Sequence, residues 1–178
     1  VVISGAASDL QKAEKIILPG VGAFGQAMQK LREKKLINEL NKQVLEEKKP
    51  FLGICLGMQL VALDSNEWGM HQGLGWINGH VRRFDSKELK VPHVGWNNVS
   101  FKKHALVQGI PSNTDFYFVH SYRMQCPAEF VAGTSEYGSE FAAAVQKNNI
   151  FATQFHPEKS QKYGLRLLKN FIKWNGVP

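Results

Sequence analysis

A short run in the first third of the chain sets a cysteine between two glycines. Gly53-Ile54-Cys55-Leu56-Gly57 has the form G-x-C-x-G and directly follows the apolar residues Phe51 and Leu52. Between a buried strand and a helix, such a run is the thiol version of the nucleophile elbow, whose tight turn presents the reactive side chain. The start of the helix would favour a Cys55 thiolate, and the backbone amide of Leu56 could stabilise an oxyanion. Taken alone, the run fits a buried core cysteine equally well.

A second motif far downstream offers a base and a carboxylate. His156-Pro157-Glu158 follows an apolar, strand-like run. In a parallel sheet the C-terminal ends of strands gather along one edge, so His156 could meet Cys55 there despite the long stretch between them. Glu158 could then hold the imidazole in the tautomer that catalysis needs. By itself the motif fits a surface turn, but beside the elbow it predicts a catalytic triad of Cys55, His156 and Glu158.

A glycine-rich loop covers residues 18–25, Leu-Pro-Gly-Val-Gly-Ala-Phe-Gly, between a predicted strand and a predicted helix. Two interpretations compete. A phosphate-binding loop is disfavoured because no Gly-Lys-Ser/Thr follows and the G-x-G-x-x-G spacing fails. A second oxyanion donor, the backbone amide of Val21 or Gly22, would complete an acyl-transfer site, and the pattern favours this interpretation.

The elements that must position these residues alternate between strand and helix in the first part of the chain. Apolar runs and 3.6-residue periods predict, in order, a strand at 1–3, a strand at 15–18, a helix over 24–44 that Pro50 ends, a strand at Phe51–Cys55 and a helix over 56–63. Such alternation indicates a parallel sheet with helices on both faces.

From about Leu74 onward, short strand-like runs separated by turn residues predict an antiparallel layer. The runs are 81–84, 91–94, 116–121, 130–134, 142–146 and 150–154. A closing helix is predicted over 161–173, with an apolar side made of Leu165, Leu168, Phe171 and Ile172. The sequence therefore predicts a mixed α/β fold, with a mainly parallel sheet flanked by helices and a small antiparallel layer.

Composition narrows the class of protein. The 178 residues fit one domain spanning 1–178, and 43% hydrophobic with 21% charged residues is typical of a globular core. No apolar run of about 18 residues and no signal-peptide pattern is found, so no membrane span is predicted. The net charge of +7 could suit nucleic acid, but acids interleave with the basic residues, which fits a solvated helix face.

The two cysteines, Cys55 and Cys126, do not resemble a disulfide framework. Because no disulfide pattern is found, the reducing cytoplasm is the expected location of the protein. Cys126 precedes Pro127 and is interpreted as inert. No Cys/His cluster has the spacing of metal ligands, so neither a metal nor another cofactor is predicted.

Together these motifs resemble class I glutamine amidotransferases, which carry a Pro-Gly-Val/Gly loop, Gly-x-Cys-x-Gly-x-Gln and a late His-Pro-Glu. Blocks at 18–25, 53–60, 91–97, 116–122 and 154–160 carry the resemblance across most of the chain. More narrowly, the blocks are similar to glutaminase subunits that pass ammonia to a (β/α)8-barrel cyclase making imidazole glycerol phosphate in histidine biosynthesis. The resemblance implies a flavodoxin-like fold, hydrolysis of L-glutamine to glutamate and ammonia, and a heterodimer with the barrel.

The resemblance also implies roles for further residues. Positions that match residues holding glutamine, with Glu67 facing its α-ammonium group, are Gln59, Glu67, Tyr117, Ser121 and Tyr122. Positions that match the surface docking on the barrel are Pro92, His93, Val94, Gly95, Trp96, Asn97 and Lys159. Trp96 could instead be a partly buried aromatic, but an expected loop setting favours docking. His93 and His120 are interpreted as structural or interface residues, not catalytic ones.

One departure from the family concerns the start of the chain. Family members begin with a further strand and helix that contain an Asp-Tyr-Gly-type segment, and no such unit precedes the first residues here. We therefore expect about 25 to 30 residues to be missing, since a strand and its crossover need about that length. Because that strand lies inside the sheet, an unpaired edge is expected.

Three alternatives remain open. A paralogue with the same triad could feed ammonia to a synthase of surface-sugar biosynthesis, and its partner would distinguish it. A cysteine peptidase would also use the triad, but Gln59 after the elbow favours a small amide substrate. A basic nucleic-acid-binding module would explain only the charge of +7, and its binding would depend on salt.

Overall fold

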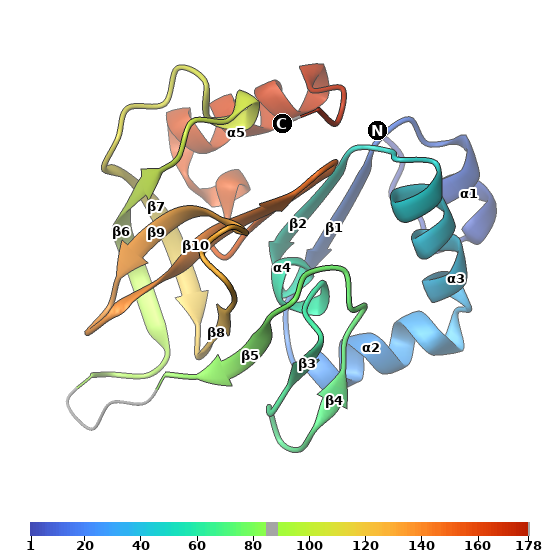
Figure 1. Cartoon of the computed structure of the whole chain (residues 1–178), viewed down its shortest axis with the longest axis horizontal. Coiled ribbons are helices and arrows are strands. Elements are labelled where there is room, and N and C mark those ends of the chain that lie inside the picture. Colours follow the sequence, from blue (N-terminus) through green and yellow to red (C-terminus); the bar gives the residue numbers. More distant parts are fainter. Residues whose placement is uncertain (85–88, 178) are drawn as a thin grey trace.

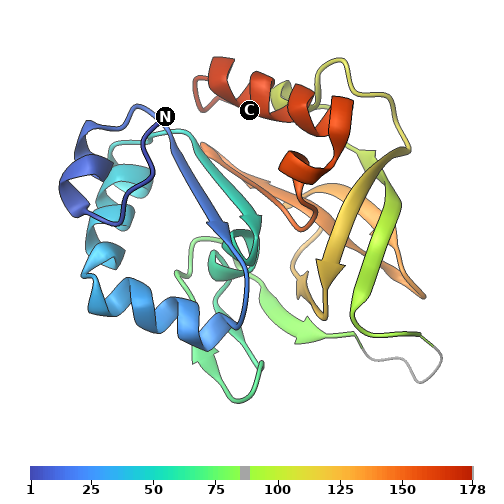
Figure 2. The same cartoon turned by 180° about the vertical axis from the view of Figure 1, so that it is seen from behind.

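The structure, a computed structural model, describes residues 1–84 and 89–177. Its helices and helical turns are α1 (Ala7–Lys12), α2 (Phe24–Glu33), α3 (Leu36–Asn41), η1 (Lys42–Glu46), α4 (Leu56–Leu60), η2 (Ala105–Val107), η3 (Pro157–Lys159) and α5 (Gln161–Lys173). Its strands are β1 (Ile16–Gly20), β2 (Phe51–Cys55), β3 (Asp64–Ser65), β4 (His71–Gln72), β5 (His80–Arg83), β6 (His93–Phe101), β7 (Thr114–His120), β8 (Tyr122–Gln125), β9 (Val131–Glu136), β10 (Glu140–Lys147) and β11 (Ile150–Thr153). Helices α1 to α3 lie on one side of β1 and β2, and α5 lies on the other (Figures 1 and 2).

The larger sheet has seven strands in the order β1-β2-β11-β10-β9-β6-β7. Strands β1, β2 and β11 pair in parallel, and antiparallel pairs continue from β11 through β10, β9 and β6 to β7. The predicted mixed α/β fold is confirmed. Within the described part of the larger sheet, however, parallel pairing is limited to three strands, so the antiparallel share is larger than expected. The links joining β9, β10 and β11 are too short for the crossover that parallel pairing requires.

A smaller, four-stranded sheet has the order β4-β3-β5-β8 and lies beside the larger one (Figure 1). The chain passes from β7 of the large sheet to β8 of the small sheet through Ser121 alone. Strands β3, β4 and β8 lie outside the runs that the sequence predicts. The two sheets are thus joined directly at the end of β7.

Both faces of β2 are buried, which explains its uninterrupted apolar sequence. Phe51 packs with Phe24 and the other apolar residues of α2 and α3 in one core. Leu52 and Ile54 point to the opposite face, where they share a second core with Phe171 of α5. The strand has the predicted bounds, and its burial fixes the position of the residue at its end.

Three predictions in the first half of the chain differ from the structure. Residues 1–3 form no strand, and Ile3 is 100% exposed, because no neighbouring strand pairs with this short run. The helix expected over 24–44 is divided at Lys35, whose φ of 55° is left-handed. This break lets Leu31 and Leu36 on the two segments both enter the core. The helix after β2 is also shorter than expected and ends at Leu60.

Helix α5 has the predicted bounds, but its buried face is different. Gly164, Leu167 and Phe171 are buried, whereas Leu165 and Ile172 are 52% and 66% exposed. Sequence periodicity found the helix because apolar residues occur on both of these sides. Contact with the sheet, and not hydrophobicity alone, selects the buried side.

Candidate active site

The turn from β2 into α4 holds Cys55 in a strained backbone conformation. Its φ of 53° and ψ of −106° are unusual for a residue with a side chain. The flanking glycines make the turn possible, because a Cβ on Gly57 would lie 1.8 Å from the Leu18 carbonyl oxygen. A Cβ on Gly53 would lie 2.7 Å from the Gly57 carbonyl oxygen. The predicted elbow is therefore present, and it directs the cysteine out of the end of the sheet.

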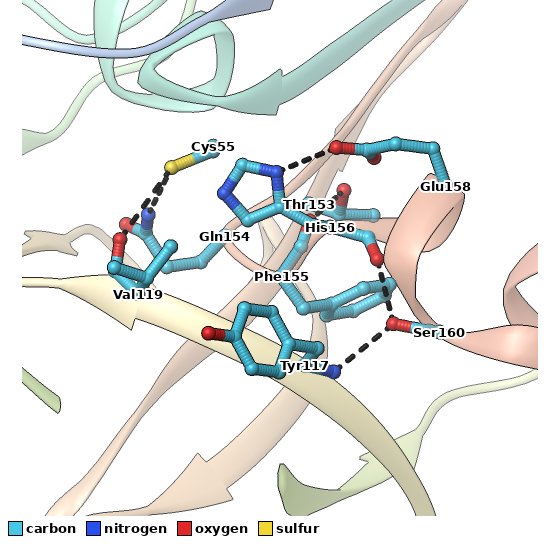
Figure 3. Close-up of polar contacts among 9 residues, drawn as sticks. All are labelled: Cys55, Tyr117, Val119, Thr153, Gln154, Phe155, His156, Glu158 and Ser160. Carbon is cyan, nitrogen blue, oxygen red and sulfur yellow. Dashed lines mark hydrogen bonds and ion pairs between the residues drawn. The ribbon is translucent and has the colours of Figure 1, made fainter. Parts of the chain in front are cut away.

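His156 reaches the same edge of the sheet from β11. This strand pairs in parallel with β2, in a register that sets Thr153 opposite Ile54. Both strands therefore end at the same edge of the sheet. The Nδ1 atom of His156 donates to Glu158 Oε1 at 2.7 Å. Figure 3 shows the imidazole between the Cys55 sulfur and the Glu158 carboxylate. The structure thus brings together the three residues of the predicted triad.

A serine and a glycine hold the turn that carries His156. Ser160 Oγ donates to the carbonyl oxygen of His156 at 2.6 Å and accepts from the amide of Tyr117 at 3.0 Å (Figure 3). The amide of His156 donates to the Tyr117 carbonyl oxygen at 2.9 Å. A Cβ on Gly164 would lie 1.9 Å from the Pro157 carbonyl oxygen, so α5 can approach the turn this closely only with glycine there. These contacts fix the imidazole relative to β7.

The charges of the triad support one another. Interaction with the Cys55 thiol, and then the hydrogen bond to Glu158, raises the pKa of His156 to about 9. Partial burial opposes ionisation of Glu158, but the hydrogen bond from His156 keeps the pKa of that carboxyl below its usual value. An imidazolium next to a carboxylate is the state that stabilises a neighbouring thiolate.

The sulfur is not yet hydrogen-bonded to the base. Cys55 Sγ donates to the Val119 carbonyl oxygen at 3.9 Å and accepts from Gln154 Nε2 at 3.8 Å. Within the described part of the chain, the buried Nε2 atom of His156 has no hydrogen-bond partner. Catalytic hydrogen bonds are often long in structures without substrate, so this geometry is compatible with His156 acting as the base.

The glycine-rich loop begins where the elbow does. Gly20, the last residue of β1, pairs with Cys55 across the parallel β1–β2 ladder. Val21 and Gly22 follow directly, and Val21 is 80% exposed. Leu56, the other predicted oxyanion donor, is buried at the first position of α4. The three residues predicted to form the oxyanion hole therefore lie at the same edge as the sulfur.

The residues predicted to bind substrate are already engaged within the protein. Gln59 Nε2 donates to the Tyr122 carbonyl oxygen at 3.1 Å and to Gln154 Oε1 at 3.0 Å, so both of its amide hydrogens are used. Glu67 Oε2 accepts from the amide of Phe24 at 2.7 Å, at the start of α2. A contact from Gln59 to substrate would therefore use its carbonyl oxygen. Tyr117 lies in the middle of β7, and Ser121 directly follows the last residue of that strand.

The predicted docking block forms the start of a strand, and its assignment to a loop is wrong. Residues 93–97 belong to β6, where they pair with β7. Side chains therefore alternate: Val94 and Trp96 are 56% and 49% exposed, whereas His93 is only 4% exposed. Pro92 is exposed and Asn97 half-buried. The side chain of His93 is thus too buried for the docking role predicted for it.

Lys159 and Trp96 both lie next to Tyr117. Lys159 Nζ is 5.8 Å from the centre of the Tyr117 ring, and the Trp96 ring is 6.1 Å from it. Gly95, between Val94 and Trp96, has a φ of 135° with open space around its Cα. The exposed part of the predicted docking surface is therefore continuous with the residues that hold His156.

Sequence reasoning missed two residues of the site. Gln154, fully buried, contacts the Cys55 sulfur, and Ser160, 2% exposed, holds His156. The one sequence signal that could have found Gln154 is its position, directly before Phe155 and His156 in the motif of the predicted triad. Cys126, in contrast, is a free thiol whose pKa burial raises to about 11, as expected for an inert cysteine.

The chain is similar to several known proteins over most of its length. The model of the family "Glutamine amidotransferase class-I" matches residues 4–174. Imidazole glycerol phosphate synthase subunit HisH 1 of Campylobacter jejuni (strain RM1221) is 54% identical over 167 residues, which cover 93% of this chain and 83% of that protein. Imidazole glycerol phosphate synthase subunit HisH 2 of Vibrio vulnificus (strain YJ016) is 47% identical over 176 residues, covering 98% and 82%.

A solved structure of a glutamine amidotransferase shares the fold, with a TM-score of 0.72 at 19% identity, over 98% of this chain and 85% of that one. The family model spans nearly the whole chain, and the curated relatives match it over most of their own length. On these grounds the chain is a member of the class I glutamine amidotransferases, within the HisH subunits of imidazole glycerol phosphate synthase.

Proposed function

We propose that this glutaminase subunit hydrolyses L-glutamine through a glutamyl thioester on Cys55. One observation carries the assignment of residues: His156 stands between the strained Cys55 and the carboxylate of Glu158, with 2.7 Å from Nδ1 to Oε1 (Figure 3). Nucleophile, base and orienting carboxylate are the three parts that nucleophilic amide hydrolysis requires.

In the first step the Cys55 thiolate attacks the carboxamide carbon of glutamine, and the carbonyl electron pair moves to oxygen. Backbone amides of Leu56 and of the Val21–Gly22 loop stabilise that oxyanion. The carbon–nitrogen bond then breaks while His156 gives its proton to the departing nitrogen. Ammonia leaves, and the glutamyl group remains on sulfur.

In the second step His156, now neutral, takes a proton from water. The hydroxyl adds to the thioester carbon, the carbon–sulfur bond breaks, and glutamate is released with the thiolate restored. Glu158 accepts from Nδ1 throughout, which keeps Nε2 as the nitrogen that exchanges protons. Substrate glutamine is held beside these atoms by Gln59, Glu67, Tyr117, Ser121 and Tyr122.

The ammonia passes to a (β/α)8-barrel cyclase subunit that docks on the start of β6. The exposed Val94 and Trp96, with Lys159 close by, support this surface. It adjoins Tyr117, whose carbonyl oxygen holds the backbone of His156. A partner seated there would lie next to the source of ammonia, and its docking could also set the geometry of the exposed Val21–Gly22 loop.

The cellular setting is part of the proposal. Both cysteines are free, which suits a reducing cytoplasm. None of the helices in the described parts of the chain is long and apolar enough to cross a membrane. We treat residues 1–178 as one amidotransferase domain with L-glutamine and the barrel as its partners.

The test is reconstitution with a barrel cyclase of the imidazole glycerol phosphate pathway. Glutamine hydrolysis and cyclase product are measured with and without the nucleotide substrate of the barrel. The proposal is supported if the complex makes cyclase product from glutamine, at a rate higher than that of glutamine hydrolysis by the chain alone. Equal glutaminase rates would contradict the role of docking. A complex that makes product from added ammonia but not from glutamine would contradict the function.

A further inference from the structure

Two buried histidines outside the triad form a chain of hydrogen bonds. His93 on β6 and His120 on β7 face each other in the β6–β7 ladder, and their side chains meet with 3.0 Å between Nδ1 and Nε2. They are 4% and 6% exposed. The His93 ring stacks between Tyr137, at 4.1 Å, and Phe118, at 4.9 Å. This apolar setting lowers the pKa of His93 to about 4 and that of His120 to about 3, so both rings are neutral.

The partners of the two rings fix where each proton lies. His120 Nδ1 is 2.8 Å from the carbonyl oxygen of Tyr122, which can only accept, so this nitrogen donates. The Nε2 atom of neutral His120 must then accept from Nδ1 of His93. That leaves Nε2 of His93 as an acceptor, 3.3 Å from Asn97 Nδ2, which donates. All the hydrogen bonds therefore point the same way, from β6 toward Tyr122.

The Tyr122 carbonyl oxygen, where this direction ends, joins the histidine pair to a second set of hydrogen bonds that reaches the nucleophile. The Tyr122 carbonyl oxygen also accepts from Gln59 Nε2 at 3.1 Å, and the second hydrogen of that amide goes to Gln154 Oε1 at 3.0 Å. Gln154 Nε2 donates to Cys55 Sγ at 3.8 Å (Figure 3). Because Gln59 uses both hydrogens, the amide of Gln154 cannot be flipped without losing a bond. Its donor nitrogen is thereby aimed at the sulfur.

We propose that Gln154 is a positioning residue for the Cys55 thiolate, held in place through Gln59 by the His93–His120 pair behind it. An N–H donor gains strength when its acceptor becomes an anion, so Gln154 stabilises the thiolate more than the thiol. The chain of bonds also ties the first residues of β6, which carry Val94 and Trp96, to the sulfur. This inference rests on the proposed function, in which Cys55 is the nucleophile.

The test is the rate at which iodoacetamide alkylates Cys55 in the full chain, followed by peptide mass spectrometry at pH 7 and pH 10. Gln154→Met removes the donor at similar volume. We expect it to slow alkylation about tenfold at pH 7, where thiolate supply limits the rate, and to leave pH 10 within about twofold. His120→Phe keeps an aromatic ring without its nitrogens and should slow alkylation at pH 7 by about threefold.

Matched controls separate positioning from general loss of structure. His104 is another partly buried histidine whose pKa burial lowers, and it belongs to neither the triad nor the chain of bonds. His104→Phe should leave the ratio of the two rates unchanged. The Cys126 peptide reports on opening of the fold within the same samples. If Gln154→Met does not fold, Gln154→Leu, which also lacks the donor and adds no charge, decides the question by the same ratio.

The outcomes distinguish this inference from the proposed function. A pH 7 rate that falls in the Gln154 variant, with Gln154→Met and His120→Phe together costing less than the product of their separate effects, supports one connected chain. Unchanged pH 7 rates in the Gln154 variants overturn the inference alone. Glutamine turnover that survives in Cys55→Ala overturns the proposed function as well.

Discussion

Three buried histidines in two regions of the molecule differ in charge. His156, 3% exposed, has a pKa raised to about 9 by the thiol of Cys55 and then by Glu158. His93 and His120 are almost as buried, yet their pKa values are lowered to about 4 and about 3, mainly by desolvation. Burial is common to the two regions, so it cannot account for the difference.

The partners of the rings account for it. His156 faces a carboxylate and a thiol, which become anions and stabilise an imidazolium. The other two rings are hydrogen-bonded to neutral groups: each other, an asparagine amide and the Tyr122 carbonyl oxygen. The positive charges of His156 and Arg123 lower the pKa of His120 further. One region is therefore built to move a proton, and the other holds its protons in fixed places.

Removing the base should have the largest effect on this comparison. His156→Gln deletes the group that we propose to protonate ammonia and activate water, and we expect kcat for glutamine to fall about 10²- to 10⁴-fold. Steady-state glutaminase assays of the complex measure it, with His104→Phe as the control. If the two substitutions lowered kcat equally, His156 would have no special role.

Removing the charge of the carboxylate should have the next largest effect. Glu158→Gln takes away the anion that supports the imidazolium, and its amide can orient the ring wrongly. One hydrogen bond to a charged group is worth about 1.5–3 kcal/mol, which corresponds to a loss in kcat of about 10- to 150-fold. The pKa of His156, followed by NMR titration, should fall toward its ordinary value. A titration that stays near pH 9 would assign the raised pKa to Cys55 alone.

Loosening the turn of the triad should cost less. Ser160→Ala removes one bond to the His156 carbonyl oxygen and one from the Tyr117 amide. We expect a fall in kcat of about tenfold and a loss of about 1–3 kcal/mol in the free energy of unfolding. Ser135 is a matched control, since its buried hydroxyl has no partner among the described residues. Ser135→Ala should leave both quantities unchanged, and an equal effect of the two changes would contradict the role of Ser160.

The two regions should oppose each other in the pH dependence of stability. The raised pKa of His156 gives stability that is complete below pH 6.5 and is lost as the pH rises through about 9. The lowered pKa values of His93 and His120 give stability that is complete above pH 6.5 and is lost as the pH falls toward 4 and 3. Each group changes the free energy of unfolding by at most about 1.4 kcal/mol per pH unit.

Urea unfolding between pH 4.5 and 9.5 measures both arms of this curve. His120→Phe should flatten the acidic arm, and Glu158→Gln should flatten the alkaline arm. A wild-type curve that rises steadily from pH 7 to pH 9 would contradict the account of His156.

The elbow could be predicted from the sequence because its causes are local. Gly53 and Gly57 are needed for close contacts within a few residues or with the adjacent strand, and they leave a clear pattern around Cys55. Strand β2 was predictable for a similar reason, since burial on both faces produces an unbroken apolar run. His156 and Glu158 could be paired with Cys55 because parallel strands end at one edge.

The remaining features of the site depend on contacts between segments that are distant in the sequence. Such contacts leave no periodic signal. Ser160 and Gln154 act through bonds to β7 and to the elbow, and neither partner can be identified from neighbouring residues. The run Gly95-Trp96-Asn97 looks like a loop, yet pairing with β7 makes it a strand and sends His93 inward. Sequence therefore predicted which residues of the triad lie together better than the contacts that hold them there.

We propose that one thiol, Cys55, performs the reaction, and the presence of two free cysteines allows a direct test. Ammonia release from glutamine is measured for Cys55→Ala and for the matched Cys126→Ala, each in complex with the barrel cyclase. We expect no turnover above background for Cys55→Ala and a rate within about twofold of wild type for Cys126→Ala, because burial keeps that thiol protonated. Glutamine turnover that persists in Cys55→Ala would contradict the account.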